Sequence, residues 1–197
     1  MKSMIAEPET RQKILFAAAE QFRLVGPRKT SMQQIARHAG LARATLYLHF
    51  SGKKALYGTL LEEVTQSFVD EVKELVKSQK SAPRKFKDMV QLTAATYASN
   101  PVLLAALSGD SEFSIEHVAT PIMTAYGEAI LGPLREMLTQ GIAESSIRDI
   151  DVDRTAYLIY ELGNHLLVKE LAGQGTFRLD EILDTMDDMV FNGIKHD

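Results

Sequence analysis

"IARHAGLARATLYLHF", residues 35–50, joins two short helical patterns through a single glycine. Gly40 accepts the positive φ that ends a helix, a backbone conformation that other residues adopt only at a cost. The first pattern stops at this glycine after about two turns, and the second covers about 42–48. Two short helices joined by a turn of about three residues are typical of a helix-turn-helix motif.

The sequence before this stretch predicts a third helix in the same domain. Apolar residues recur every three and four positions from Thr10 to Val25, and Gly26 with its following proline ends that pattern. Ser31 and Gln34 then have the spacing of a capping box, in which the hydroxyl and the amide each cover an orphan backbone N–H. The first fifty residues therefore predict a compact three-helix unit.

The rest of the chain also has a helical period. Gly52 and Lys53 open a long pattern that runs to about residue 79, and further patterns cover about 85–99, 101–108, 114–144, 151–172 and 179–194. No segment alternates in the manner of a strand between hairpin turns. The sequence predicts an all-α fold, with an N-terminal helix-turn-helix domain over 1–50 joined to a larger helical domain over 51–197.

The amino-acid composition excludes several kinds of site. The 197 residues contain no cysteine, which excludes disulfides, thiolate zinc sites and cysteine nucleophiles.

The net charge of −4 is unevenly distributed along the chain. Residues 1–58 carry ten Lys and Arg against three Asp and Glu, a net charge of +7, and the remainder carries −11. A basic head on an acidic body indicates that one end faces a polyanion. Without a signal-peptide pattern or a run of about 18 apolar residues, the expected location is the cytoplasm.

The outer face of the segment after Gly40 carries chemistry that suits DNA. Arg43 can hold guanine in a bidentate fork or take a phosphate, and small Ala44 lets a helix approach the groove floor. Thr45 and Tyr47 offer hydroxyls to phosphate oxygens, which fix register. The predicted DNA-contacting residues are Ser31, Gln33, Ala42, Arg43, Ala44, Thr45, Tyr47, His49 and Lys53. The alternatives are that Tyr47 is a half-buried core aromatic and that Arg43 and Lys53 are ordinary surface charges.

The stretch "TSMQQIARHAGLARATLYLHFSGKKAL", preceded by "RQKILFAAAEQFRLVG", resembles the DNA-binding domain of TetR-type transcriptional regulators. The resemblance covers about the first sixty residues and departs from the family where Ala42 replaces a common capping serine and Ala44 a frequent glycine. It implies a homodimer that binds a palindromic operator, represses transcription and is released by a small-molecule inducer. The two heads would meet successive major grooves about 34–36 Å apart. The matching positions are Ser31, Ile35, Ala36, Ala39, Gly40, Thr45, Leu46, Tyr47, His49, Phe50 and Lys53.

The last two helical patterns are the candidate dimer interface. The resemblance suggests that two such hairpins, one from each subunit, form a four-helix bundle. Packing within one chain explains the same apolar stripes and stays open as the alternative. The predicted interface residues are Ala156, Ile159, Leu162, Gly163, Leu166, Ile182, Met186, Met189 and Val190.

The middle of the chain supplies candidate ligand contacts, which are large apolar residues with a few hydroxyls. Such residues equally fit an ordinary helical core. Because no Arg or Lys interrupts these stripes, we expect a lipophilic or aromatic ligand. The predicted lining is Phe68, Met89, Leu92, Thr93, Thr96, Tyr97, Leu103, Leu107, Phe113, Met123 and Tyr126.

Catalytic, metal and cofactor motifs find no support in the sequence. The histidines lack HExxH spacing, and no phosphate loop or nucleophile elbow occurs. The pair Glu161 and His165 and the group Glu112, Glu116 and His117 fit helix-stabilising or solvated charges better than a metal site. We expect no enzyme activity, no metal and no cofactor. Two other hypotheses remain, a DNA-binding protein that senses no ligand and a helical interaction protein without DNA binding.

Overall fold

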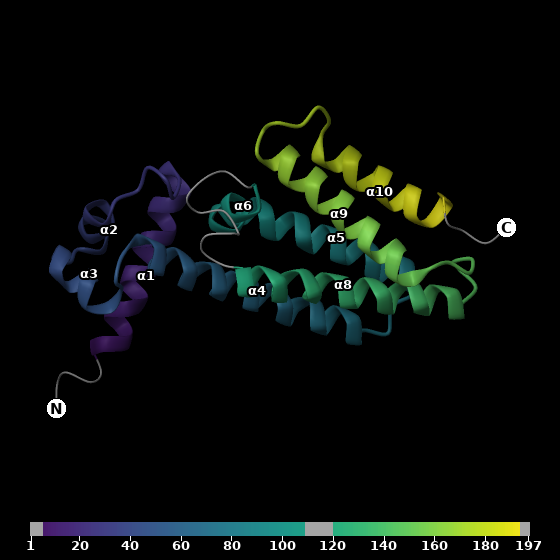
Figure 1. The fold of residues 1–197 in the computed structure, drawn as a ribbon, viewed down its shortest axis with the longest axis horizontal. Helices are drawn as coiled ribbons and strands as arrows, with labels where there is room; N and C mark the ends of the chain where they lie inside the picture. The colour runs from purple at the N-terminus through teal and green to yellow at the C-terminus, as the bar shows by residue number, and fades with distance from the viewer. Residues whose placement is uncertain (1–5, 109–119, 194–197) are drawn as a thin grey trace. The chain divides into compact units, whose positions relative to one another are not determined.

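The computed structural model describes residues 6–108 and 120–193, and within these ranges the chain is helical and has no strand (Figure 1). This observation confirms the predicted all-α class. The helices are α1 (Ala6–Val25), α2 (Met32–Ala39), α3 (Arg43–His49), α4 (Lys53–Lys77), α5 (Ala82–Ser99), α6 (Pro101–Leu107), α8 (Thr120–Ala143), α9 (Val152–Leu171) and α10 (Leu179–Gly193).

The chain divides into two compact units that interleave in sequence. The head unit comprises Met1–Val64 and Asn100–Ile122, and the body unit comprises Thr65–Ser99 and Met123–Asp197. Helix α4 contributes residues to both units, and α6 groups with the head. The boundary that we predict after residue 50 thus falls inside the head unit, ahead of α4.

Local sequence signals shape the head unit as expected. The N–H of Gln34 donates to Ser31 Oγ (3.3 Å), and the N–H of Ser31 donates to Gln34 Oε1 (2.7 Å), which forms the capping box of α2. Gly40 ends α2 with a φ of +66°. Helices α1 and α2 pack together through the buried side chains of Ile14, Ala18, Phe22, Ile35 and Ala36.

Helix α6 is held in the head unit by Tyr57 of α4. The buried Tyr57 hydroxyl donates a hydrogen bond to the carbonyl of Val102, and its ring meets Phe22 edge to face with centroids 5.9 Å apart. Burial raises the pKa of Tyr57, so the phenol stays a neutral donor. One tyrosine therefore connects α1, α4 and α6.

The body unit packs α5 against α9 and α10, with α9 and α10 also in contact. The buried faces carry Phe86 and Met89 on α5, Leu134 on α8 and Leu167 on α9. The buried ammonium of Lys85 donates to Gln140 Oε1 at 3.0 Å. Across the part of the chain that the structure covers, no helix is long and apolar enough to cross a membrane.

Ser145, just after α8, adopts a φ of +57°, a left-handed conformation that disfavours side chains with a Cβ. We expect Ser145→Gly to raise the free energy of unfolding by about 0.5–1 kcal/mol, measured by urea denaturation. Ser145→Ala is the matched control, because alanine keeps the Cβ and should give no gain. Equal stabilities for the glycine and alanine variants would contradict this account.

Candidate nucleic-acid interface and ligand chamber

Helix α3 is anchored by its inner face and leaves its outer face exposed. Leu46 is fully buried and Phe50 nearly so, which fixes the rotation of this seven-residue helix. Ala42 at the N-cap has extended backbone (φ −67°, ψ 144°) and no side-chain hydrogen bond, as its alanine predicts. The exposed residues of this segment are Ala42, Arg43, Ala44, Tyr47 and Leu48.

Arg43 and Tyr47 form a pair on the exposed face, one helical turn apart. Arg43 Nη2 donates to Tyr47 Oη at 3.2 Å, and the guanidinium lies 5.5 Å from the centre of the tyrosine ring. Tyr47 is 44% exposed, so its phenol belongs to the surface and not to the core. The pair presents a planar cation and a hydroxyl from a narrow helix, as contacts to bases and phosphates require.

The other predicted DNA contacts lie at the edges of this face. Ser31 and Gln33 are exposed at the start of α2, and Thr45 and His49 are half-buried on α3. Leu48, which the sequence analysis leaves out, is 85% exposed one turn after Ala44. The i, i+4 spacing with Ala44 is the pattern that places Leu48 on the outer face.

Lys53 has partners inside the head unit. Its ammonium donates to the carbonyls of Arg28 (3.1 Å) and Thr30 (2.8 Å), in the turn between α1 and α2. Thr30 is itself buried and donates through Oγ1 to the carbonyl of Gly26 at 2.8 Å. Lys53 thus ties the first turn of α4 to this turn, and a contact to phosphate stays a prediction.

We expect Lys53→Ala to lower the free energy of unfolding by about 1–3 kcal/mol, because two backbone carbonyls lose a charged donor. Thermal unfolding followed by circular dichroism measures this change. Lys29→Ala, in the same turn but exposed, is the control with an equal charge change. If the two variants unfold at the same temperature, Lys53 is a surface charge and the proposed tie is wrong.

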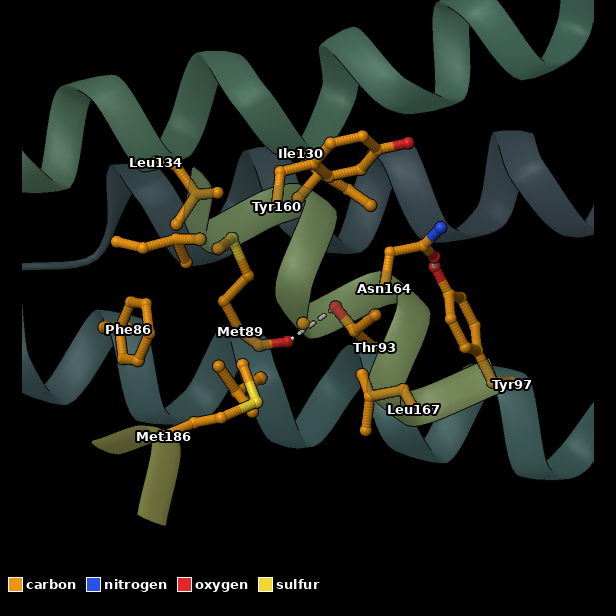
Figure 2. A pocket seen from close by; sticks show the side chains of 13 residues that line it. Phe86, Met89, Thr93, Tyr97, Ile130, Leu134, Tyr160, Asn164, Leu167 and Met186 are labelled. Carbon is orange, nitrogen blue, oxygen red and sulfur yellow. Dashed lines mark hydrogen bonds between the residues drawn. The ribbon is translucent and has the colours of Figure 1, made fainter. Parts of the chain in front are cut away.

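The body unit contains a small cavity among α5, α8, α9 and α10, here called the chamber (Figure 2). Its volume is about 40 Å³, which suits a water molecule, so a larger ligand requires side chains to move. Met89 and Met186 on its wall have the flexible side chains that such movement needs. The lining is Phe86, Met89, Val90, Thr93, Tyr97, Ile130, Leu134, Ile159, Tyr160, Gly163, Asn164, Leu167 and Met186.

The chamber has few polar groups, and two of them bind each other. Tyr97 Oη donates to Asn164 Oδ1 at 2.6 Å, from α5 to α9, whereas Thr93 Oγ1 donates to the Met89 carbonyl (2.8 Å) of its own helix. Burial raises the pKa of Tyr97, so this phenol remains neutral. None of the lining residues is Lys, Arg, His, Asp or Glu.

Residues 14–60 match the family model of bacterial regulatory proteins, tetR family. Residues 14–60 therefore form a DNA-binding domain of the TetR type. The match covers the capping box, Gly40 and the whole of α3, the same features on which the resemblance depends, and it confirms the predicted family.

Relatives of known name extend the likeness beyond this DNA-binding domain. The nucleoid occlusion factor SlmA of Aliivibrio fischeri (strain MJ11) is 26% identical over 104 residues, or 52% of this chain and 53% of that protein, so the match spans about half of SlmA. The fatty acid metabolism regulator protein of Bacillus subtilis (strain 168) is 22% identical over 187 residues, 93% of this chain and 94% of that protein.

A solved structure shows the same fold over nearly the whole chain. The transcriptional regulator FadR from Bacillus subtilis, in complex with stearoyl-CoA, has a TM-score of 0.72 at 20% identity and covers 93% of this chain and 98% of that one. The two Bacillus subtilis proteins are named as regulators, in agreement with the prediction of no enzyme activity.

The structure divides the predicted ligand contacts into groups by their place in the fold. Met89, Thr93 and Tyr97 line the chamber. Tyr126 is buried but does not line the chamber. Its ring centroid lies 4.9 Å from that of Phe68 and 6.4 Å from that of Tyr97. Leu92 and Thr96 are half-buried on α5, Leu103 and Leu107 lie on α6 in the head unit, and Phe113 and the Met123 side chain lie outside the described residues.

The chamber also has lining residues that the sequence analysis misses, chiefly Tyr160 and Asn164 on α9. The pattern that points to Asn164 is a polar amide that interrupts an apolar stripe between Gly163 and Leu167. From the sequence alone we expect such an amide at the surface, because the apolar period does not show which element the amide side chain faces.

The predicted interface residues also divide by burial. Ala156, Gly163, Met186 and Val190 are buried inside the body unit, and Ile159, Leu166 and Ile182 are half-buried. The Met186 side chain packs closely against Gly163. A Cβ added at Gly163 would lie only 2.8 Å from Met186 Cε. Leu162 on α9 and Met189 on α10 are exposed, and α9 adds exposed Tyr157 and Leu158.

The acidic and histidine residues that we consider for a metal site form no group of three ligands within the described ranges. Glu161 and His165 are exposed on α9. Glu112, Glu116 and His117 lie outside the described residues.

Proposed function

We propose that this regulator is a repressor that binds a palindromic operator as a homodimer and is released by a lipophilic or aromatic small molecule. The observation that carries the proposal is the two-sided α3, with Leu46 and Phe50 buried and Arg43 and Tyr47 exposed. A helix of this kind can enter a major groove without unfolding its own core.

Charge supports the DNA partner. The net +7 of residues 1–58 favours a polyanion, and the Arg43 guanidinium has the planar fork that reads guanine O6 and N7. Two heads related by a twofold axis would read half-sites about 10 base pairs apart, or a multiple of that spacing.

Exposed apolar side chains support the homodimer. Leu158 and Leu162 are one turn apart on α9, beside Tyr157, and Met189 is exposed on α10. Apolar side chains that share a helical face in this way are typical of protein interfaces. A second copy of the same face would cover them through an isologous contact, which also gives the twofold axis that a palindrome needs.

The chamber supports a small-molecule inducer with an apolar body. Its wall is formed mostly by aliphatic and aromatic side chains, and the Bacillus subtilis relative of the same fold is described in complex with stearoyl-CoA, a molecule with a long apolar chain. Helix α4 has residues in both units, so a change in its position is one covalent route from the body unit to the head unit. A ligand that favours the DNA-incompetent state by about 1.4 kcal/mol shifts the ratio tenfold.

Two linked experiments test the proposal. Selection from random duplexes with the purified protein should enrich a palindrome, and a thermal-shift screen should find apolar compounds that then lower operator affinity. A ligand at a hundred times its Kd should stabilise the protein by about 2.7 kcal/mol. Enrichment of an operator that no stabilising compound releases would favour the ligand-blind hypothesis. No enrichment at low salt would favour a helical interaction protein.

A further inference from the structure

We propose that the chamber selects a mostly apolar ligand that carries one uncharged hydrogen-bonding group, and that Tyr97 and Asn164 read this group. The inference rests on the proposed function, in which the chamber is the ligand site. It adds the polarity of the ligand and the two residues that determine it.

Two polar lining residues, Tyr97 and Asn164, lie together at one end of the chamber. Figure 2 shows Tyr97 and Asn164 pointing toward each other there, whereas Phe86 and Met186 lie at the other end. The Thr93 hydroxyl donates to a carbonyl of its own helix at 2.8 Å. The remaining lining is apolar apart from Tyr160. The Tyr160 hydroxyl packs against Gly127 of α8, where an added Cβ would lie 3.2 Å from the hydroxyl oxygen. An apolar body therefore has one favourable orientation, with its polar group toward Tyr97 and Asn164.

The Tyr97–Asn164 pair has unused hydrogen-bonding capacity. The bond at 2.6 Å uses the tyrosine O–H and one lone-pair site on Asn164 Oδ1. The Asn164 amide N–H groups can donate to the oxygen of a ligand carbonyl or hydroxyl. A ketone, ester, amide or alcohol therefore satisfies the pair without breaking it.

Charged groups are disfavoured at this site. A carboxylate or an ammonium in the chamber would lose its water and find no opposite charge, since none of the lining residues is ionised. Tyr97 cannot supply an anion, because burial raises its pKa. The chamber thus discriminates by charge as well as by shape.

A purely structural role for the pair makes a different prediction. If the bond only braces α5 against α9, its loss lowers stability and weakens all ligands to the same degree. If the pair reads the ligand, its loss weakens only ligands that carry the hydrogen-bonding group.

The test uses four probes with one common ring system, namely naphthalene, 2-acetylnaphthalene, 2-naphthoate and 2-naphthylmethylammonium, measured by calorimetry on the full chain without DNA. We expect the acetyl probe to bind at least about tenfold more tightly than either charged probe, because only the charged probes leave an unpaired charge in the chamber. Tyr97→Phe and Asn164→Leu should each weaken the acetyl probe about three- to tenfold and leave naphthalene unchanged. Thr139→Val removes an exposed hydroxyl that is bonded to its own helix (2.8 Å) and lies outside the chamber lining, so it should leave the series unchanged.

Asn164→Asp gives a second test that needs no loss of binding. It places a carboxylate of nearly the same shape at the polar end, so we expect the ammonium probe to bind more tightly to this variant than to the natural protein. The inference is overturned if the charged probes bind as well as the acetyl probe, if both loss variants weaken naphthalene equally, or if no probe binds. Because DNA is absent, failure of operator release in a separate assay would refute the proposed function and leave this selectivity standing.

Discussion

Leu162→Glu is expected to turn the dimer into a monomer and to weaken binding to a palindromic operator by about 100-fold or more. Leu162 is 52% exposed on α9, one turn from Leu158 at 57%. In an isologous interface each substitution occurs twice, so two carboxylates would be buried close to the twofold axis without partners. A monomer also loses the gain in affinity from engaging both half-sites at once.

Sedimentation velocity and fluorescence anisotropy with an operator duplex measure the two effects. Leu24→Glu is the matched control, because Leu24 is similarly exposed, at 59%, but lies on α1 in the head unit. The control should stay dimeric. A Leu162→Glu protein that sediments as a dimer would place the interface elsewhere.

Arg43→Ala is expected to cost about 1–3 kcal/mol of operator affinity and to relax the preference at one base pair of each half-site. The guanidinium is exposed on the outer face of α3, where Tyr47 holds it through a hydrogen bond and ring contact. Its loss removes a bidentate contact to a base, which a phosphate contact alone cannot replace.

Competition binding against operators changed at single positions measures this specificity. Arg148→Ala removes the same charge from an exposed loop of the body unit and should leave affinity and preference unchanged. Tyr47→Phe keeps the ring beneath the guanidinium and should have a smaller effect than Arg43→Ala. If Arg43→Ala binds all competitors as the natural protein does, the outer face of α3 does not read bases.

The sequence predicts the helices of the head unit closely, because the features that bound them are local. Ser31 and Gln34 begin α2, Gly40 ends it, and both features act through backbone groups within four residues. The outer face of α3 is predictable for the same reason, since the spacing of Leu46 and Phe50 fixes which side is buried.

Contacts between distant parts of the chain are not predictable in this way. The sequence predicts Lys53 as a DNA contact, with an ordinary surface charge as the alternative. Its ammonium instead bonds to the carbonyls of Arg28 and Thr30, more than twenty residues earlier. On α9, Ala156 and Leu162 belong to one predicted stripe, but the first is buried and the second is exposed. Periodicity identifies an apolar face and does not say whether the same chain or another copy covers it.

Methylation interference on a selected operator tests most directly whether α3 enters the major groove. Dimethyl sulfate modifies guanine N7 in the major groove and adenine N3 in the minor groove. We predict that N7 methylation blocks binding at guanines in two half-sites about 10 base pairs apart, or a multiple of that spacing, and that Arg43→Ala abolishes the interference at one guanine of each half-site. Interference from adenine N3 alone, or an unchanged pattern with Arg43→Ala, would contradict the account.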